Sequence, residues 1–259
     1  MTRAIDLNAD VGEECSDDAA LLPVVTSASV AAGGHAGGGD VLDATVRLAL
    51  ACGVSVGAHP SYPDRAGFGR ISRAADHDTV SLRAFVQEQV AAVAAACTAH
   101  GARLAHVKAH GALYADVAAD VAQAWAFLEG IRLAVADGTV DAAIAVVGPP
   151  SAVLVQACAD ASVRYVVEAF ADRAYAPDGS LVPRSQEGSV LTDAAAVLDQ
   201  VRRIVLDDEV IASDGTRVPL HAETLCLHGD TPGAVRLAGL VRSDLESRGV
   251  VLRPVVGTM

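Results

Sequence analysis

The chain has 259 residues, which is enough for one large domain or two small ones with a substantial core. Its net charge of -13 and its aromatic content of 3% argue against a nucleic-acid binder, because phosphate contacts need clustered Lys and Arg and single strands need stacking platforms. Hydrophobic residues make up 52% of the chain and are mostly Ala, Val and Leu, which is typical of an α/β protein with Ala-rich helices.

The location of the protein can be predicted from its termini and its cysteines. The first residues lack the charged and apolar regions of a signal peptide, and apolar runs such as 48–52 are too short to cross a bilayer. The five cysteines are scattered and form no C-x-x-C pair, which is typical of reduced thiols that pack as small hydrophobic residues. We therefore expect a cytoplasmic protein with no membrane partner.

The densest group of chemically active residues lies in one predicted strand, near residues 104–110. Apolar residues alternate there with His106, Lys108 and His110. Alternate residues of a strand share a face, so these three side chains should project to the same side. Two imidazoles and an ammonium group are costly to bury unless an anion or a metal meets them. We therefore expect other polar groups to converge on this row.

The first predicted strand alternates apolar residues with Asp6, Asn8 and Asp10, which should also share a face. The D-x-N-x-D spacing resembles a calcium loop as well. Such a loop needs Gly at its sixth position and Glu at its twelfth, where this chain has Val11 and Asp17. A strand is therefore the preferred interpretation.

Further apolar runs and helical patterns alternate along the rest of the chain. The other predicted strands are 27–34, 53–59, 142–148, 164–170 and 223–228. The predicted helices are 40–51, 79–100, 118–136, one that ends near 161, 193–205 and one that ends near 248. Trp125 and Phe127 are predicted core residues. The loop 174–188 has the length of a lid or binding loop, and Asp214-Gly215 predicts a hairpin turn within an excursion of about 208–222.

Strands that alternate with helices predict a parallel sheet. Six of the seven predicted strands end in polar groups, which are Asp10, His35, His59, His110, Asp172, and His228 with Asp230. A β/α barrel gathers its active site at the carboxyl ends of its strands, whereas an open sheet uses fewer of them. The pattern favours a TIM-like (β/α) barrel that forms a single domain over residues 1–259, with no linker or low-complexity segment.

Six motifs resemble the LamB/YcsF family of 5-oxoprolinase A subunits, and they occupy residues 6–13, 57–65, 106–114, 171–175, 181–184 and 226–230. The resemblance implies a seven-stranded β/α barrel related to glycoside hydrolases and polysaccharide deacetylases. It also implies ATP-dependent hydrolysis of 5-oxoproline to glutamate, with ATP and Mg²⁺ as co-substrate. Two companion subunits that resemble parts of urea amidolyase are the implied partners.

The chain departs from the family pattern in its second motif, at residues 31–38. Gly34 stands where the family usually has an aromatic residue, and Gly38 stands where it has an acid. Asp40 lies two residues after the position of that acid, and Ala109 replaces the usual Pro between Lys and His. These departures leave open a reduced or altered substrate preference.

An amide is a stable bond, and this stability determines the expected chemistry. ATP can activate the amide by converting its carbonyl oxygen into a phosphate ester. We expect Lys108 to steady the phosphate or oxyanion, while Asp10, His59 or His110 serves as the base that guides water onto the carbon. The sequence does not choose among these three bases. The other candidates for binding substrate or ATP are Asn8, His35, His106, Asp172, Arg173, Arg184, His228 and Asp230, of which the two arginines suit a carboxylate or phosphate.

Two other functions remain open from the sequence. A metal-dependent amidohydrolase or deacetylase could take two or three ligands from Asp10, His35, His59, His106 and His110, with the first three as the main candidates. No H-E-x-x-H pair fixes a metal, however. A non-catalytic subunit that binds a small acid is the second alternative. The sequence also leaves open whether ATP binds this chain or a companion.

Overall fold

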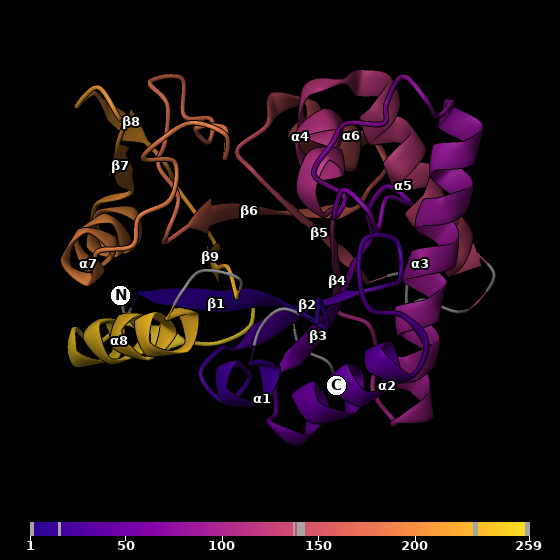
Figure 1. The fold of residues 1–259 in the computed structure, drawn as a ribbon, viewed down its shortest axis with the longest axis horizontal. Helices are drawn as coiled ribbons and strands as arrows, with labels where there is room; N and C mark the ends of the chain where they lie inside the picture. The colour runs from indigo at the N-terminus through magenta and orange to yellow at the C-terminus, as the bar shows by residue number, and fades with distance from the viewer. Residues whose placement is uncertain (1–2, 15–16, 137, 139–142, 230–232, 257–259) are drawn as a thin grey trace.

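The computed structural model describes residues 3–14, 17–136, 138, 143–229 and 233–256. Seven parallel strands form the centre of the fold, with helices around them (Figure 1). In barrel order they are β1 (Ala4–Val11), β2 (Ser27–Ala31), β3 (Ser55–His59), β4 (His106–Lys108), β5 (Ala145–Gly148), β6 (Arg164–Phe170) and β9 (Thr224–Leu227). Because β9 pairs with both β6 and β1, the sheet closes on itself. The predicted seven-stranded β/α barrel is confirmed.

Three short strands lie outside this barrel. β10 (Val251–Leu252) pairs in parallel with the first two residues of β1. β7 (Glu209–Ile211) and β8 (Arg217–Pro219) form an antiparallel hairpin in which Val210 lies opposite Val218. The hairpin lies within the excursion predicted from its Asp-Gly turn, beside α7 in Figure 1.

Helices surround the barrel, with α3 and α5 on one side of it and α7 and α8 on the opposite side in Figure 1. The helices are α1 (Asp18–Leu21), α2 (Gly39–Ala51), α3 (Thr79–Ala99), α4 (Gly111–Ala119), α5 (Val121–Ala136), α6 (Ala152–Asp160), α7 (Ala194–Arg202), a π-helical turn (Arg203–Asp207) and α8 (Ala234–Ser247). Asp78, Ser151 and Asp193 cap α3, α6 and α7 by accepting hydrogen bonds from backbone N–H groups. Within the described residues, no helix is long and apolar enough to span a membrane.

The strand β1 shows how sequence alternation separates the two sides of the barrel wall. Its odd-numbered residues join the apolar core that the helices cover, and they are Ile5, Leu7, Ala9 and Val11. Its even-numbered residues bond to side chains of other strands across the interior, and they are Asp6, Asn8 and Asp10. The shared polar face predicted for this strand is therefore confirmed, and it lies inside the barrel.

One predicted helix differs from the structure. The segment 118–136 is divided at Asp120, whose backbone is extended and whose carboxylate accepts a hydrogen bond from the Gln123 N–H at 2.9 Å. The prediction that Trp125 is a core residue is wrong, because its side chain is 42% exposed, while Phe127 is buried. Residues two positions apart project from opposite sides of a helix, so a buried Phe127 turns Trp125 outward.

Candidate active site

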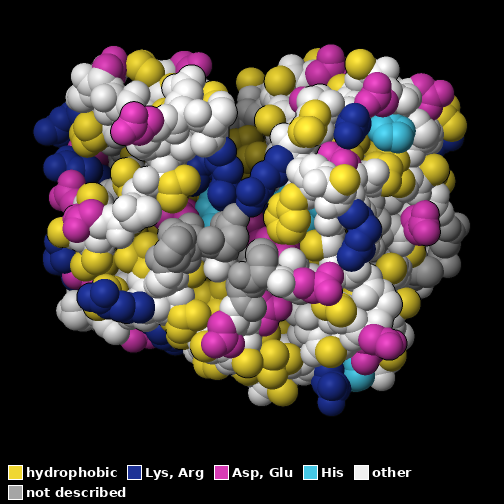
Figure 2. All heavy atoms as spheres, viewed as in Figure 1, with side chains coloured by type: hydrophobic (Ala, Val, Ile, Leu, Met, Phe, Trp, Pro, Cys, Tyr) yellow, Lys and Arg dark blue, Asp and Glu magenta, His cyan; other side chains and the backbone are white. Residues whose placement is uncertain are grey.

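A cavity of about 470 Å³ opens at the carboxyl ends of the barrel strands, where β/α barrels place their active sites. Figure 2 shows a hollow in this face, with Lys or Arg, His and acidic side chains around it. The charged and titratable side chains that line the cavity are Asp10, Glu13, His59, Arg70, Lys108, His110, Tyr114, Asp116, Arg173, Arg184 and His228.

Lys108 lies at the floor of this cavity and is only 2% exposed. Its Nζ lies 2.8 Å from Asp10 Oδ1 and 2.9 Å from Glu168 Oε1, and it donates to Asn8 Oδ1 and Cys226 Sγ at 3.3 Å each. Burial alone would lower the pKa of Lys108, but the neighbouring Asp10 carboxylate raises it well above its ordinary value. The side chain is therefore a fixed positive charge.

The two carboxylates beside this ammonium group differ in their access to the cavity. Glu168 is fully buried, and it accepts hydrogen bonds from Asn8 Nδ2 at 3.0 Å and from the Tyr114 hydroxyl at 2.9 Å. Asp10 lines the cavity, and its Oδ2 lies 3.4 Å from His59 Nε2. Burial opposes the ionisation of Asp10, but the charges of His59 and Lys108 hold its pKa well below the usual range.

Two histidines and a glutamate form a second polar group on the wall of the cavity. His59 donates from Nδ1 to the Lys108 carbonyl at 2.8 Å, and His110 donates from Nε2 to the Phe68 carbonyl at 2.9 Å. Their other nitrogens, His59 Nε2 and His110 Nδ1, lie 3.0 Å apart. Glu13 Oε1 lies 3.2 Å from His110 Nδ1 and 3.8 Å from His59 Nε2. We call Glu13, His59 and His110 the histidine–glutamate cluster.

Burial and neighbouring charges shift the pKa values of these histidines in different directions. Burial would lower the pKa of His59, but the Asp10 carboxylate raises it. Burial lowers the pKa of His110 despite its contact with Glu13, and it lowers the pKa of His35 to about 4. His35 donates from Nε2 to Glu13 at 3.1 Å, and its ring stacks on His110 with centroids 3.6 Å apart. A neutral His35, which does not line the cavity, therefore orients Glu13 and His110 of the cluster.

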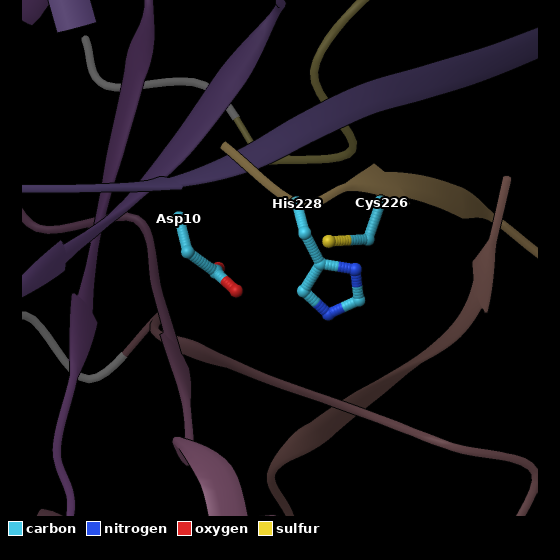
Figure 3. Close-up of side chains that lie close together, drawn as sticks. All are labelled: Asp10, Cys226 and His228. Atoms are coloured by element: carbon cyan, nitrogen blue, oxygen red, sulfur yellow. The ribbon is translucent and has the colours of Figure 1, made fainter. Parts of the chain in front are cut away.

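His228 lines the cavity near Asp10 and Cys226 (Figure 3). Its Nδ1 lies 2.9 Å from Asp172 Oδ1, and its ring stacks on Phe170 with centroids 5.1 Å apart. Asp172 is fully buried, and it holds the imidazole of His228 in place. Burial raises the pKa of Cys226 well above its ordinary value, despite the nearby charge of Lys108, so the thiol is protonated.

The predicted binding loop forms another part of the cavity wall. Leu181, Val182, Pro183 and Arg184 line the cavity. Arg173 donates from Nε to the Ser189 carbonyl at 3.1 Å and from Nη2 to the Val182 carbonyl at 2.6 Å. These bonds make Arg173 a support for the loop, whereas the exposed Arg184 carries its charge at the cavity wall.

The structure thus brings most of the predicted residues together, in two layers. Asp10, His59, Lys108, His110, Arg173, Arg184 and His228 line the cavity. Among the described residues, Asn8, His35, His106 and Asp172 do not line it but lie behind those that do. His106 Nε2 lies 3.2 Å from Ser29 Oγ, and burial together with the charge of Lys108 lowers the pKa of His106 to about 3. Asp230 lies outside the described residues.

Sequence reasoning misses four residues that the site depends on, which are Glu13, Tyr114, Glu168 and Cys226. Glu13, Tyr114 and Cys226 lie within the family motifs, but the motifs alone assign them no role. One signal in the sequence does mark the site, because Lys108 is the only lysine in a chain whose other basic residues are arginines, 18 of the 19 Lys and Arg. A position that keeps Lys in such a chain has a chemical requirement that Arg does not meet.

The departures at the second motif have a structural explanation at Gly34. A Cβ atom there would lie 2.5 Å from both Gln89 Oε1 and Ser61 Oγ, so this position has no room for a side chain. Gln89 is buried and accepts a hydrogen bond from the Ser61 N–H at 3.1 Å. Asp40 is exposed in the first turn of α2. The buried polar groups of Gln89 and Ser61 therefore occupy the space that a side chain at position 34 would need.

Comparisons with known proteins agree with this architecture. A model of the LamB/YcsF family matches residues 5–259. The chain is 47% identical to the 5-oxoprolinase A subunit of Streptomyces avermitilis over 251 residues, which cover 95% of this chain and 97% of that protein. It is 44% identical to the 5-oxoprolinase A subunit of Methylococcus capsulatus over 262 residues, with coverages of 99% and 98%. The crystal structure of the lactam utilization protein from Thermus thermophilus matches with a TM-score of 0.88 at 39% identity, over 96% of this chain and 99% of that one.

Proposed function

Because the chain belongs to the LamB/YcsF family, we propose that it is one subunit of a 5-oxoprolinase, which opens the cyclic amide of 5-oxoproline to give glutamate. Its relatives are named as 5-oxoprolinase A subunits and as a lactam utilization protein, and these names support this substrate class. The single observation that carries the proposal is the buried ammonium group of Lys108 at the floor of the cavity.

The size and charge of the cavity suit a small anionic substrate. A volume of about 470 Å³ falls within the range of small-molecule pockets. Arg70 and Arg184 line the cavity, and a guanidinium group matches the planar geometry of a carboxylate or phosphate. 5-Oxoproline carries one carboxylate, so these arginines would hold the substrate by the end that does not react.

The reacting end would face Lys108. Attack of water on an amide carbonyl places negative charge on its oxygen, and a fixed positive charge in a dry site stabilises that oxygen. The C–N bond of the ring then breaks, and the departing nitrogen takes a proton. Asp10 is a poor base for this reaction because Lys108 and His59 hold its pKa low. His110 of the histidine–glutamate cluster is the better candidate for activating the water, because burial lowers its pKa and favours the neutral imidazole.

ATP with Mg²⁺ is part of the proposal as a co-substrate. ATP would transfer its γ-phosphoryl group to the amide oxygen and leave as ADP, which makes the ring carbon more reactive to water. The phosphate would depart as inorganic phosphate when the new carboxylate of glutamate forms, and Lys108 would bind the negative charge of the phosphate. Two companion subunits that resemble parts of urea amidolyase complete the proposed enzyme, and the term subunit in the names of the relatives supports an assembly. The need for ATP supports a cytoplasmic location for this reaction.

The test is release of glutamate from 5-oxoproline, with ATP, Mg²⁺, this chain and its two companion subunits, each omitted in turn. The proposal expects glutamate only from the complete mixture. Glutamate release that persists without this chain would refute it.

A further inference from the structure

We propose that the histidine–glutamate cluster binds one divalent transition-metal ion, with Zn²⁺ as the first candidate, through Glu13 Oε1, His59 Nε2 and His110 Nδ1. The three ligand atoms come from β3, from the N-cap of α4 and from the segment after β1. All three residues line the cavity.

The proton positions of the two rings support this site. A carbonyl oxygen only accepts, so His59 carries a proton on Nδ1 and His110 carries one on Nε2. A bound metal would replace the second proton that Asp10 favours on His59, and Nε2 of His59 and Nδ1 of His110, which face each other at 3.0 Å, would then both offer lone pairs. A carboxylate oxygen adds a third lone pair at 3.2 and 3.8 Å. Two ring nitrogens and a carboxylate oxygen this close together are held by a shared cation, which is either a proton on His59 or a metal ion.

The spacing of these atoms suits a metal better than a loose collection of polar groups. Zn²⁺ binds imidazole nitrogen at about 2.0–2.1 Å and carboxylate oxygen at about 2.0–2.2 Å, so tetrahedral ligand atoms lie about 3.3–3.5 Å apart. The three observed separations of 3.0, 3.2 and 3.8 Å bracket that value. Two imidazoles and one carboxylate also form a donor set that Zn²⁺ uses when a further position stays open for water.

Each ligand is held by a partner that faces away from the proposed ion. The carbonyls of Lys108 and Phe68 fix the ring protons of His59 and His110, and the Nε2–H of His35 donates to Glu13. Such outer partners orient metal ligands and set the histidine tautomer. Phe68 also packs its ring edge-on against His110, with centroids 5.4 Å apart, and this contact limits rotation of the ligand.

A second group of ligand-type residues, Asp10, Cys226 and His228, fits a metal less well (Figure 3). The Lys108 ammonium lies 2.8 Å from Asp10 Oδ1 and 3.3 Å from Cys226 Sγ. A positive charge already occupies the space between these two ligands, and it would repel a divalent ion. The outer partners of the histidine–glutamate cluster are instead carbonyl oxygens and the neutral His35, which do not repel a cation.

The proposal that the cluster binds a metal depends only on this geometry. The catalytic consequence of that metal depends in addition on the proposed function. A bound Zn²⁺ lowers the pKa of a coordinated water to about 7 and so supplies a nucleophile near neutral pH. Because the cluster and Lys108 face one cavity, such a water would attack a carbonyl whose oxygen lies toward the ammonium.

The test measures metal binding directly on the full chain after chelator treatment. Zn²⁺ would be titrated in competition with a chromophoric chelator, and Co²⁺ would report the ligand geometry through its visible absorption. The informative variants are Glu13→Gln and His110→Asn. The matched controls are His100→Asn, which changes a surface histidine paired with Asp43, and Cys226→Ser, which changes the other group.

We expect one Zn²⁺ per chain, and an affinity at least about tenfold lower in both informative variants, since even loss of an outer partner lowers metal affinity by about 10–100-fold. The two controls should bind as the unchanged chain does. Circular dichroism identifies any variant that fails to fold. If one informative variant is unfolded, the comparison of the other one with the unchanged chain decides whether the cluster binds the metal. Absence of stoichiometric binding, equal binding in the informative variants, or loss of binding in Cys226→Ser would each overturn the proposal. Zn²⁺ binding without glutamate release would instead refute only the proposed function.

Discussion

Replacing Lys108 with Met should destabilise the protein strongly, because it removes the positive charge from between two buried carboxylates. Lys108 lies 2.8 Å from Asp10 and 2.9 Å from Glu168, and the three side chains are 2%, 9% and 0% exposed. Removing one partner of a buried ion pair leaves an uncompensated charge and costs about 3–5 kcal/mol. Met has a similar length and keeps most of the packing, so the loss measures mainly electrostatics.

Urea unfolding at pH 8 measures this loss, with Arg248→Met as the matched control. Arg248 forms a partly exposed ion pair with Asp244, and its loss should cost less than about 1 kcal/mol. The pH dependence gives a second check. Lys108 helps to hold the pKa of Asp10 low, so Asp10 takes up a proton at higher pH in the variant. The stability difference should therefore shrink as the pH falls from 8 toward 5. A difference below about 1 kcal/mol at pH 8, or one that grows on acidification, would refute this reasoning.

Two further predictions concern Gly57 and His106, which lie against each other. Gly57→Ala should destabilise the protein by about 1–3 kcal/mol, because the new Cβ would lie 2.2 Å from His106 Nε2. The control is Gly239→Ala in α8, where the new Cβ would meet open space, and this change should be neutral or stabilising by up to about 1 kcal/mol. Adding His106→Ala to Gly57→Ala should restore stability in thermal unfolding, and no restoration would contradict the steric explanation. His106→Asn should flatten the dependence of unfolding free energy on pH by up to about 1.4 kcal/mol per unit between pH 6.5 and 4. The folded protein holds the His106 pKa near 3 while the unfolded chain binds a proton near 6.5, so acidification favours unfolding. An unchanged slope would contradict a neutral, buried His106.

The barrel could be predicted because its signals are local. Each strand is an apolar run or an alternation of apolar and polar residues, helical patterns separate the strands, and polar residues mark most of the ends that face the cavity. The alternation in β1 places Asp6, Asn8 and Asp10 on one face without reference to any other strand. The predicted row is confirmed for His106 and Lys108, which lie in β4, whereas His110 follows the strand as the N-cap of α4; all three side chains are buried.

The partners inside the barrel could not be predicted, because they depend on register between distant strands. Asn8 lies opposite Cys226, and Glu168 lies opposite Thr224. No local pattern shows that these positions meet, so the sequence alone indicates a small hydrophobic residue at Cys226 and no role for Glu168. The same limit applies to Glu13, whose contacts with His35, His59 and His110 require distant segments to be closed into a barrel.

The most direct test of the central claim is the rate of glutamate release from 5-oxoproline with folded Lys108→Ala, in the complete mixture of ATP, Mg²⁺ and companion subunits. Arg248→Met is the control, because Arg248 lies outside the residues that line the cavity. If Lys108 stabilises the developing charge, its loss should lower the turnover rate by about 10²–10³-fold, as the loss of an oxyanion donor does, while the control keeps the full rate. A folded Lys108→Ala protein that releases glutamate at the unchanged rate would contradict this role for Lys108.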